Sequence, residues 1–395
     1  MNNRIELLAP AGDLDRLKIA LIYGADAVYI GGKKLSLRSA ASNFSLEEIK
    51  EGVEFAHERN KKVYVACNMV MHDEDDIDSL SYLKSLKEIG VDAVIVSSLY
   101  LASLATSIGL DAHISTQLSI TNSESINFLE KRNISRVVLA RECSLKQIQN
   151  IKKHTNIELE VFIHGGMCSS YSGKCLLSSL MCDRDPNRGG CAHSCRWRYH
   201  LYQNKQRLDD EYLSMSSKDL CLIRYIPQLI ESGVSSLKIE GRMKSQHYLA
   251  FIISAYRKCI DDYYSNNKMD YDYYEKLIEF GENRITGHGF IEGNVTINEM
   301  LMNINDEYYR PGEFIGVVRG FNKKSNRVIL EVKNKILANK KYVVLSPNKG
   351  TRIIKIKKMF KENEEIDSYT IAKDYIEIEV DEMLEPYDLI HIFEK

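Results

Sequence analysis

The sequence predicts an α/β protein with an N-terminal (β/α)8, TIM-like barrel followed by a small all-β barrel. Two observations predict this order. Through the first 240 residues, short Val/Ile/Ala-rich runs alternate with longer amphipathic segments that stop at Gly or Asn. From Glu313 onward the apolar period changes to two, between turns of Asn, Gly, Lys and Pro. A chain of 395 residues also exceeds what one hydrophobic core usually serves, so we expect two domains.

Eight apolar runs in the N-terminal region are expected to form strands. They span residues 6–9, 27–31, 63–68, 93–97, 113–117, 136–140, 159–164 and 236–240. Helices are expected between them, for example at 13–23, 46–58, 77–89 and 145–153, with Asp13 and Ser45 at N-cap positions. Eight strands alternating with helices fit a barrel better than an open sheet. No Gly-x-Gly-x-x-Gly follows the first strand, which argues against dinucleotide binding.

These patterns divide the chain into three parts. We expect the TIM-like barrel at 1–263, carrying a cysteine loop at 159–198, a helical or irregular connector at 264–306, and a basic β-barrel at 307–395. Residues 319–361 contain fourteen Lys and Arg but one acid, Glu331, in a chain whose formal net charge is −2. This excess favours a phosphate-backbone partner, with Lys355, Lys357 and Lys358 as RNA-binding candidates. Lysines that protect sheet edges from aggregation are the alternative.

Composition points to a soluble globular protein. The chain is 44% apolar and 27% charged, and no apolar run reaches the ~20 residues of a membrane span. No secretory signal is visible before Pro10, so we expect a cytoplasmic protein. In that compartment nine cysteines should stay reduced or bind metal.

Four cysteines follow the seventh expected strand: Cys168, Cys175, Cys191 and Cys195. They are separated by six, fifteen and three residues, and zinc sites normally place ligand pairs two to four residues apart in both halves. An iron–sulfur cluster also needs four thiolates but tolerates one wide interval. Spacing alone therefore favours a cluster while leaving zinc, or structural or redox thiols, open. Cys182 and Cys221 are spare loop thiols nearby.

Charged side chains stand where several expected strands end, which is where active sites of this fold lie. Lys238, Glu240 and Arg242 alternate and should face one way, so with Arg141 they form a candidate site for a small anion with carboxylates. Glu240 and His164 are candidates for proton transfer. A structural ion-pair network, and a hydrogen-bonded histidine at the barrel rim, are the alternatives.

A peptidase is a second functional class to consider. A Cys–His pair is chemically available. However, four clustered thiols are poorly explained by one nucleophile, and neither a Gly-x-Ser-x-Gly nor a His-Glu-x-x-His motif occurs.

Several segments together resemble the collagenase-like peptidase family U32. The segments with this resemblance are 160–168 with 172–178, 8–12, 25–31, 187–198, 217–221 and 238–245, and the terminal β-barrel is similar to the family's C-terminal domain. The architecture most resembles the branch that makes 5-hydroxyuridine at the tRNA wobble position. Sister branches act on ribosomal RNA or on ubiquinone precursors. One departure is the stretch 284–290, RITGHGF, which only approximates the family's Thr-Thr-Gly-Phe-like motif.

The resemblance implies a function and a cofactor. It assigns a 4Fe-4S cluster to Cys168, Cys175, Cys191 and Cys195, and prephenate as the hydroxyl donor, with tRNA as the partner. An RNA-modifying enzyme is therefore the first hypothesis, and a peptidase acting on protein is the second.

Overall fold

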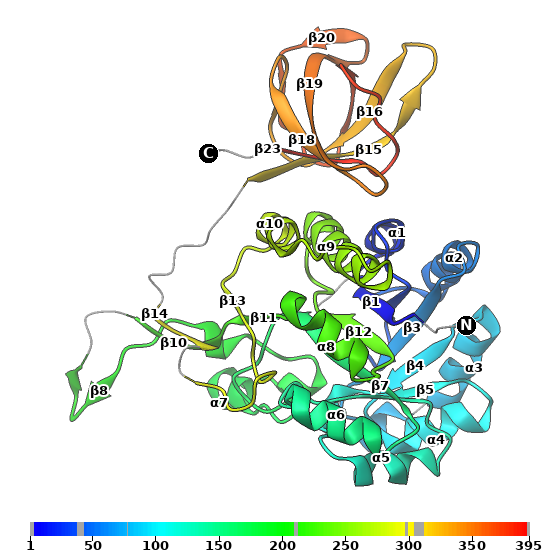
Figure 1. The fold of residues 1–395 in the computed structure, drawn as a ribbon, viewed down its shortest axis with the longest axis vertical. Helices are drawn as coiled ribbons and strands as arrows, with labels where there is room; N and C mark the ends of the chain where they lie inside the picture. Colours follow the sequence, from blue (N-terminus) through cyan, green and yellow to red (C-terminus); the bar gives the residue numbers. More distant parts are fainter. Residues whose placement is uncertain are drawn as a thin grey trace.

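The structure is a computed structural model that describes residues 4–37, 43–76, 78–208, 212–296, 299–303 (300–303 without side chains) and 312–392. It consists of a parallel (β/α)8 barrel and a smaller antiparallel β-barrel beside it (Figure 1). Both predicted fold classes are confirmed.

The first barrel is built from eight parallel strands, and all eight predicted runs are present. They are β1 (Glu6–Pro10), β2 (Ala27–Gly31), β3 (Lys62–Cys67), β4 (Ala93–Val96), β5 (Ala112–Ile114), β6 (Arg136–Val138), β7 (Glu158–Gly165) and β12 (Ser236–Ile239). The strand β12 closes the barrel because it pairs in parallel with both β1 and β7. Apolar side chains on the outer strand faces pack against the surrounding helices as one core.

The helices that cover this barrel alternate with the strands. They are α1 (Leu14–Ile22), α2 (Leu46–His57), α3 (Ser79–Ile89), α4 (Leu99–Ser107), α5 (Ser123–Glu130), α6 (Leu145–Lys153), α8 (Ile226–Glu231) and α9 (Gln246–Tyr264). The predicted N-caps are confirmed. Asp13 accepts a hydrogen bond from the Arg16 amide, and Ser45 forms a capping box with Glu48. Residue 77, the expected start of the third helix, lies outside the described residues.

Five strands end earlier than their sequence patterns predict: β3, β4 and β12 by one residue, β6 by two and β5 by three. After β5 the chain forms a 3-10 turn at Thr116–Leu118, and β6 stops at Val138. The strand β12 stops at Ile239, so Glu240 and Arg242 lie in the loop that follows it. The reason at β12 is Gly241, whose φ of +146° breaks the extended conformation.

The interior of the first barrel contains charge. Glu160 is fully buried, and its carboxylate accepts hydrogen bonds from Lys238 Nζ at 2.6 Å and Arg136 Nη1 at 3.2 Å. Burial alone would raise the pKa of Glu160, but Lys238 and Arg136 hold it at about 2. Lys238 is therefore one partner of a buried ion-pair network, the alternative that the sequence left open.

The second barrel has six strands in a closed ring. They are β15 (Glu313–Asn322), β16 (Arg327–Val332), β18 (Lys341–Ser346), β19 (Gly350–Lys361), β22 (Tyr375–Val380) and β23 (Leu389–Ile392). The ring runs β18-β23-β15-β16-β22-β19 and closes between β19 and β18, with a separate apolar core. Three short strands, β17 (Ile336–Leu337), β20 (Glu364–Ile366) and β21 (Ser368–Tyr369), lie around it.

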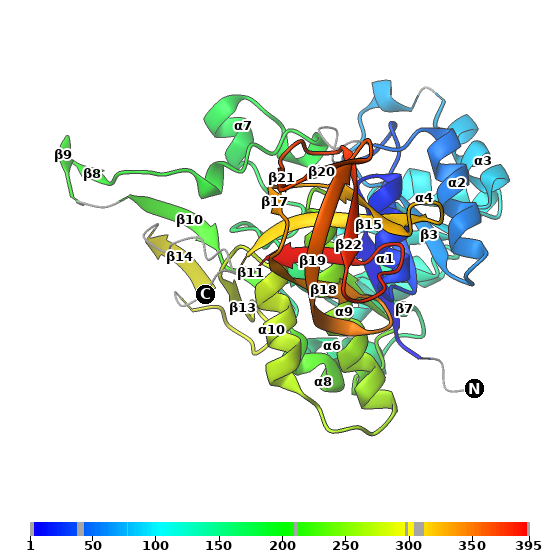
Figure 2. The same cartoon turned by 90° about the horizontal axis from the view of Figure 1, so that it is seen from above.

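The second barrel lies over α1 and α9 of the first (Figure 2), and specific polar contacts join it to α1 and the residue that follows α1. The Tyr23 hydroxyl lies 2.9 Å from the Leu345 carbonyl oxygen and 2.8 Å from that of Tyr387. Arg319 of β15 donates a hydrogen bond of 2.8 Å to Asp15 at the start of α1. Because these contacts fix orientation as well as distance, the second barrel is held against the outer helices of the first.

The segment between the barrels is more than a connector. Its helix α10 (Tyr271–Gly281) packs on α9 and contributes Tyr274, Leu277 and Ile278 to the core of the first barrel. Its strand β13 (Thr286–Gly287) pairs with β11 (Asp219–Cys221), and its strand β14 (Met300–Asn303) pairs with β10 (Leu213–Ser217). Within the described residues, no helix is long and apolar enough to cross a membrane.

Replacing Glu160 with Ala should destabilise the protein by ~3–5 kcal/mol, because Lys238 would keep a buried charge without its ion-pair partner, although Arg136 retains Glu6 and Glu158. The midpoint of urea denaturation measures this effect. Arg4→Ala is the matched control, since the Arg4–Asp261 pair is exposed at 52% and 45% of its side-chain areas and should contribute ~0–1 kcal/mol. Equal midpoints for the two variants would contradict the prediction.

Candidate functional site

The cysteine insert begins where β7 ends and covers residues 166–217. It contains the short helix α7 (Leu177–Cys182), a hairpin of β8 (Tyr202–Gln203) and β9 (Gln206–Arg207), and β10 (Leu213–Ser217). The insert contacts the barrel rim at Gly173, where a Cβ atom would lie 2.2 Å from the backbone oxygen of Gln117. Gly173 also has a φ of +72°, so both its conformation and this close approach require glycine.

Several hydrogen bonds hold the loops that carry the cysteines in a defined arrangement. Ser178 Oγ lies 3.2 Å from Ser194 Oγ and accepts a 3.1 Å hydrogen bond from the Ala192 amide. Asn187 Nδ2 donates to the carbonyl oxygen of Cys175 at 2.9 Å. The chain segments around Cys175, Cys191 and Cys195 are thereby tied together next to α7.

The thiols themselves interact. Burial raises the pKa of Cys195, Arg196 and Ser169 oppose this, and the nearby Cys191 and Cys175 thiols raise it further. Across the described part of the chain, no three His, Cys, Asp or Glu side chains are close enough to hold one metal ion. The assignment of a 4Fe-4S cluster to Cys168, Cys175, Cys191 and Cys195 stays a prediction.

A buried carboxylate links the insert to three other segments. The carboxylate oxygens of Asp219 in β11 (Asp219–Cys221) lie 3.4 Å from Arg196, 3.5 Å from Arg284 and 3.8 Å from Lys244. Lys244 Nζ also lies 2.9 Å from Glu282. Burial raises the pKa of Asp219 to about 6. This network anchors Arg196, and with it the adjacent Cys195, to the barrel.

His164 points out of the barrel. The register between β7 and β12 shifts after Lys238, so that His164 pairs with Ile239 instead of continuing the inward row of Glu160 and Phe162. Its ring is 1% exposed and lies beneath α9, with Nδ1 3.2 Å from the Tyr256 hydroxyl and Nε2 3.4 Å from Glu282 Oε2. Burial alone would lower the pKa of His164, but Cys221 and Glu282 raise it to about 9. This geometry favours a structural imidazolium over direct proton transfer to a substrate.

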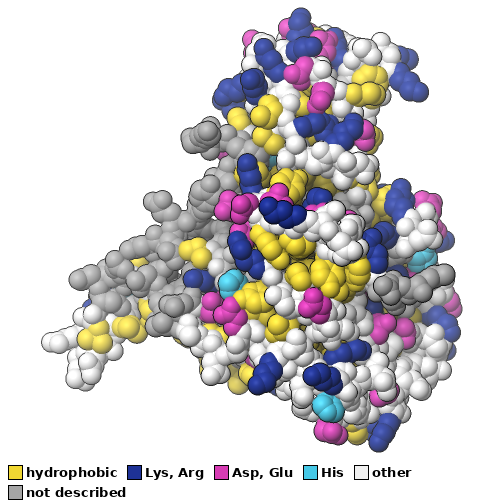
Figure 3. Space-filling view, in the orientation of Figure 1, with side chains coloured by type: hydrophobic (Ala, Val, Ile, Leu, Met, Phe, Trp, Pro, Cys, Tyr) yellow, Lys and Arg dark blue, Asp and Glu magenta, His cyan; other side chains and the backbone are white. Residues whose placement is uncertain are grey.

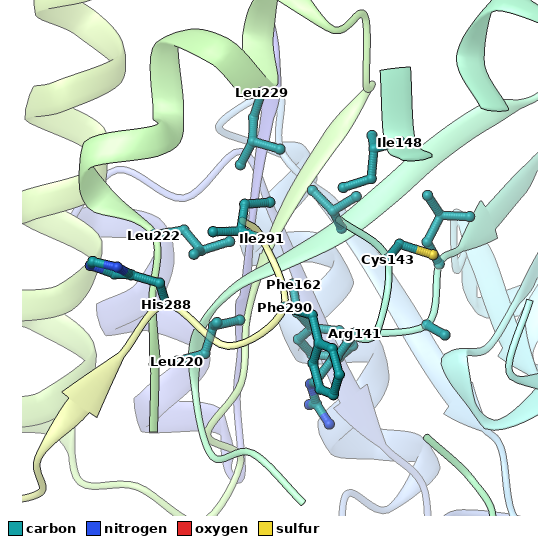
Figure 4. Close-up of a pocket in the computed structure, with 13 residues that line it drawn as sticks. Arg141, Cys143, Ile148, Phe162, Leu220, Leu222, Leu229, His288, Phe290 and Ile291 are labelled. Carbon is teal, nitrogen blue, oxygen red and sulfur yellow. The ribbon is translucent and has the colours of Figure 1, made fainter. Parts of the chain in front are cut away.

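Arg141 and Lys238 meet at one aromatic ring inside the barrel mouth. The Arg141 guanidinium lies 4.0 Å from the centre of the Phe162 ring, and Lys238 Nζ lies 5.4 Å from it. Arg141 also lines a small cavity of about 20 Å³, room for one water molecule, which the His288–Ile291 segment helps to close (Figure 4). Of these two cations, Lys238 is already neutralised by Glu160.

Glu240 and Arg242 diverge from Lys238 after β12 ends. The Glu240 carboxylate accepts a hydrogen bond of 3.3 Å from the Gly166 amide, at the first residue of the insert. Arg242 is buried and donates to Ser36 Oγ at 3.0 Å, across the mouth beyond β2. The predicted single inward row is therefore wrong in its geometry, although each of its side chains remains near the mouth.

The second barrel carries both positively and negatively charged side chains on its surface (Figure 3). Residues 307–395 contain seventeen Lys and Arg against fifteen Asp and Glu, so the excess at 319–361 is balanced by the strands that follow. Lys358 is paired with Glu365 at 2.8 Å. Lys355 and Lys357 stand on the exposed face of β19, where the intervening Ile356 is buried. These two remain the better candidates for contact with RNA.

Sequence reasoning missed Asp219, Lys244 and Glu282. Asp219 and Lys244 lie inside the segments 217–221 and 238–245 that resemble the family, so the sequence could have identified them as candidate charged residues. Their pairing could not be identified in this way, because Lys244 lies 25 residues from Asp219 and 38 residues from Glu282, and only the folded barrel brings these segments together.

The chain belongs to peptidase family U32. The sequence model of peptidase family U32 matches residues 12–301, and the model of the family's C-terminal domain matches residues 310–391. The tRNA hydroxylation protein P1 of Bacillus subtilis (strain 168) is 43% identical over 341 residues, covering 83% of this chain and 80% of that protein. An uncharacterized protease of Methanocaldococcus jannaschii is 38% identical, covering 83% of each. A 23S rRNA 5-hydroxycytidine synthase of Escherichia coli (strain K12) is 39% identical over 261 residues, which is 66% of this chain and 40% of that protein.

Replacing His164 with Gln should flatten the pH dependence of stability in the alkaline range. Its folded-state pKa of about 9 lies above the ordinary value of 6.5, so His164 stabilises the fold fully below pH 6.5 and this contribution disappears as the pH rises through 9. The lost contribution should be on the order of 3 kcal/mol. Urea denaturation at both pH values measures it, and an identical pH slope in wild type and variant would contradict the assignment.

Proposed function

We propose that the protein is an iron–sulfur enzyme that hydroxylates RNA, converting the wobble uridine of tRNA to 5-hydroxyuridine. The observation that supports this most is the cysteine insert, which is anchored over the mouth of a U32 barrel whose rim carries cationic side chains. Two relatives with names that concern RNA hydroxylation support the same class of reaction. The choice of tRNA over ribosomal RNA follows the relative that is more similar and covers more of this chain.

In this proposal Cys168, Cys175, Cys191 and Cys195 hold a 4Fe-4S cluster. Such a cluster supplies one-electron chemistry when bound. Arg196 lies next to the last of these ligands and partly offsets the negative charge of four thiolates. The Asp219 network then fixes the position of Arg196, and so holds the neighbouring ligand Cys195 in place relative to the barrel.

The hydroxyl donor in this proposal is a small anion, prephenate, bound between the rim and the insert. Its carboxylates would pair with guanidinium groups, which offer two parallel donors each. Arg141 and Arg242 are the cations that fit, whereas Lys238 is already bound to Glu160. Glu240 is the candidate for proton transfer because its carboxylate stands at the junction of rim and insert.

A peptidase is the second candidate, and one arrangement favours it. The Cys221 thiol has a pKa lowered by His164 despite burial, and His164 lies near the Glu282 carboxylate, which are the residue types of a cysteine-protease triad. Against this, His164 and Glu282 are 1% and 6% exposed beneath α9, where a peptide has no access. We expect no cleavage of denatured collagen by the wild-type protein. Cleavage that disappears in Cys221→Ala would favour the peptidase.

The first test of the proposal measures iron. Protein purified without oxygen should contain about four iron and four sulfide per chain, as a four-thiolate cluster requires. Cys175→Ala should lose that iron, while Cys259→Ala, which alters a thiol buried in the core of the first barrel, should keep it. Stoichiometric zinc without iron in the wild-type protein would rule out the cluster.

The second test measures the product. Mass spectrometry of tRNA nucleosides from a deletion strain should show no 5-hydroxyuridine until the wild-type gene is restored. Restoring Arg141→Gln instead should lower the modification at least ~10-fold, because one carboxylate partner is lost, while the iron content stays unchanged. Lys131→Gln, an exposed cation that follows α5, is the matched control. Unchanged 5-hydroxyuridine in the deletion strain would exclude this function.

A further inference from the structure

The cysteine insert extends into a narrow arm that leaves the body of the protein. The arm consists of residues 198–208, and its strands β8 and β9 pair only with each other among the described strands. Figures 1 and 2 both show these strands projecting well beyond the barrel. Asn204 and Lys205 form its turn with φ values of 49° and 66°, the conformation of a tight two-residue hairpin.

The base of the arm is firmly held. Tyr199 and Leu213 exchange two backbone hydrogen bonds of 2.9 and 2.8 Å, which join the arm to β10. Beyond this point every residue from 201 to 208 is exposed. An isolated two-stranded hairpin is marginally stable in water, so a free-standing arm of this kind gains order from whatever it contacts.

Exposed apolar and aromatic side chains are concentrated on this insert. Of the 22 large apolar side chains exposed among the described residues, nine lie between residues 171 and 212. On and beside the arm they include Trp197, Tyr202 and Tyr212, which are 39%, 63% and 45% exposed. Hydrophobic side chains on the arm are visible in Figure 3. Such a density on a small segment marks an interaction surface.

The charge of the arm selects the kind of partner. Residues 196–208 contain four cations and no acid, in the order R-W-R-Y-H-L-Y-Q-N-K-Q-R-L. Neither Arg198 nor Lys205 forms an ion pair with a described acid, and Arg198 lies 5.6 Å from the Tyr212 ring. The acids at 209–211 lie outside the described residues. Cations interleaved with exposed aromatic rings are the pattern that binds unpaired nucleotides, through phosphate contacts and base stacking.

We infer that the arm at 198–208 binds the single-stranded part of the RNA substrate, with an unpaired base stacked on Tyr202 and a phosphate held by Lys205. This inference rests on the proposed function and assigns a contact to RNA on the same insert that carries the four cysteines. A second copy of this chain is the less favoured occupant, because two such arms would bring like charges together. The second barrel, with nearly balanced charge, then has a supporting role in binding.

The test compares RNA affinities of the full-length protein, purified anaerobically. The probes are an unmodified stem–loop RNA and a fully paired duplex of equal length. Tyr202→Ala should weaken binding to the stem–loop by roughly 10- to 100-fold and change duplex binding little, since only the loop offers unpaired bases. Tyr202→Phe keeps the ring and should keep the affinity. Lys205→Gln should reduce the salt dependence of log K by about 0.7, the amount for one single-strand phosphate contact.

Matched controls lie on α5. Phe128→Ala removes an aromatic ring that is 50% exposed, and Lys131→Gln removes an exposed cation. Both should bind the stem–loop as the wild type does. Iron content measured on every variant shows whether the cysteine loops remain intact.

Three outcomes would overturn the inference. They are an unchanged stem–loop affinity for Tyr202→Ala, an equal loss on stem–loop and duplex, and a change of sedimentation state without a change of RNA affinity, which would indicate a second copy as the partner. The proposed function has its own readout, the 5-hydroxyuridine restored by the wild-type gene. If that modification is restored while the arm variants bind normally, only the role of the arm fails.

Discussion

The closure of the first barrel depends on one buried carboxylate and its two cations. Glu160 on β7 must lose its hydration when β12 closes the ring, and the cost is offset because Lys238 on β12 and Arg136 on β6 reach the same carboxylate. This requirement fixes the register of β7 against both neighbours. It also places Phe162 two residues further along, where its ring meets Arg141 at the mouth.

A second buried carboxylate, that of Asp219, holds the cysteine insert in place. Asp219 faces Arg196, Arg284 and Lys244, which come from the cysteine loop, the segment before the second barrel and the loop after β12. These ion pairs join the cysteine loop to β11, to the segment before the second barrel and to the loop after β12.

The cations of the second barrel and those of the arm have different surroundings. Among the described residues of the second barrel, seven of the fifteen Lys and Arg form ion pairs, such as Arg352 with Asp388 at 2.9 Å and Lys361 with Asp374 at 2.8 Å. Paired charges of this kind attract a polyanion less than their number suggests. The arm of the insert has fewer cations, but they stand among exposed aromatic rings.

The sequence by itself determined the periodic features of this protein. Alternating apolar runs identified eight strands, the helices with their caps at Asp13 and Ser45, and the change to an all-β domain, because periodicity is a local property of the chain. The spacing of four cysteines after β7 favoured a cluster over zinc, and this stays a prediction. Only the tertiary structure decided the direction and pairing of individual side chains. A register shift beside Lys238 turned His164 outward, Gly241 ended the strand before Glu240, and Glu160, 78 residues away in sequence, neutralised Lys238. The register and the ion pair depend on contacts between segments far apart in the chain, which no local pattern records.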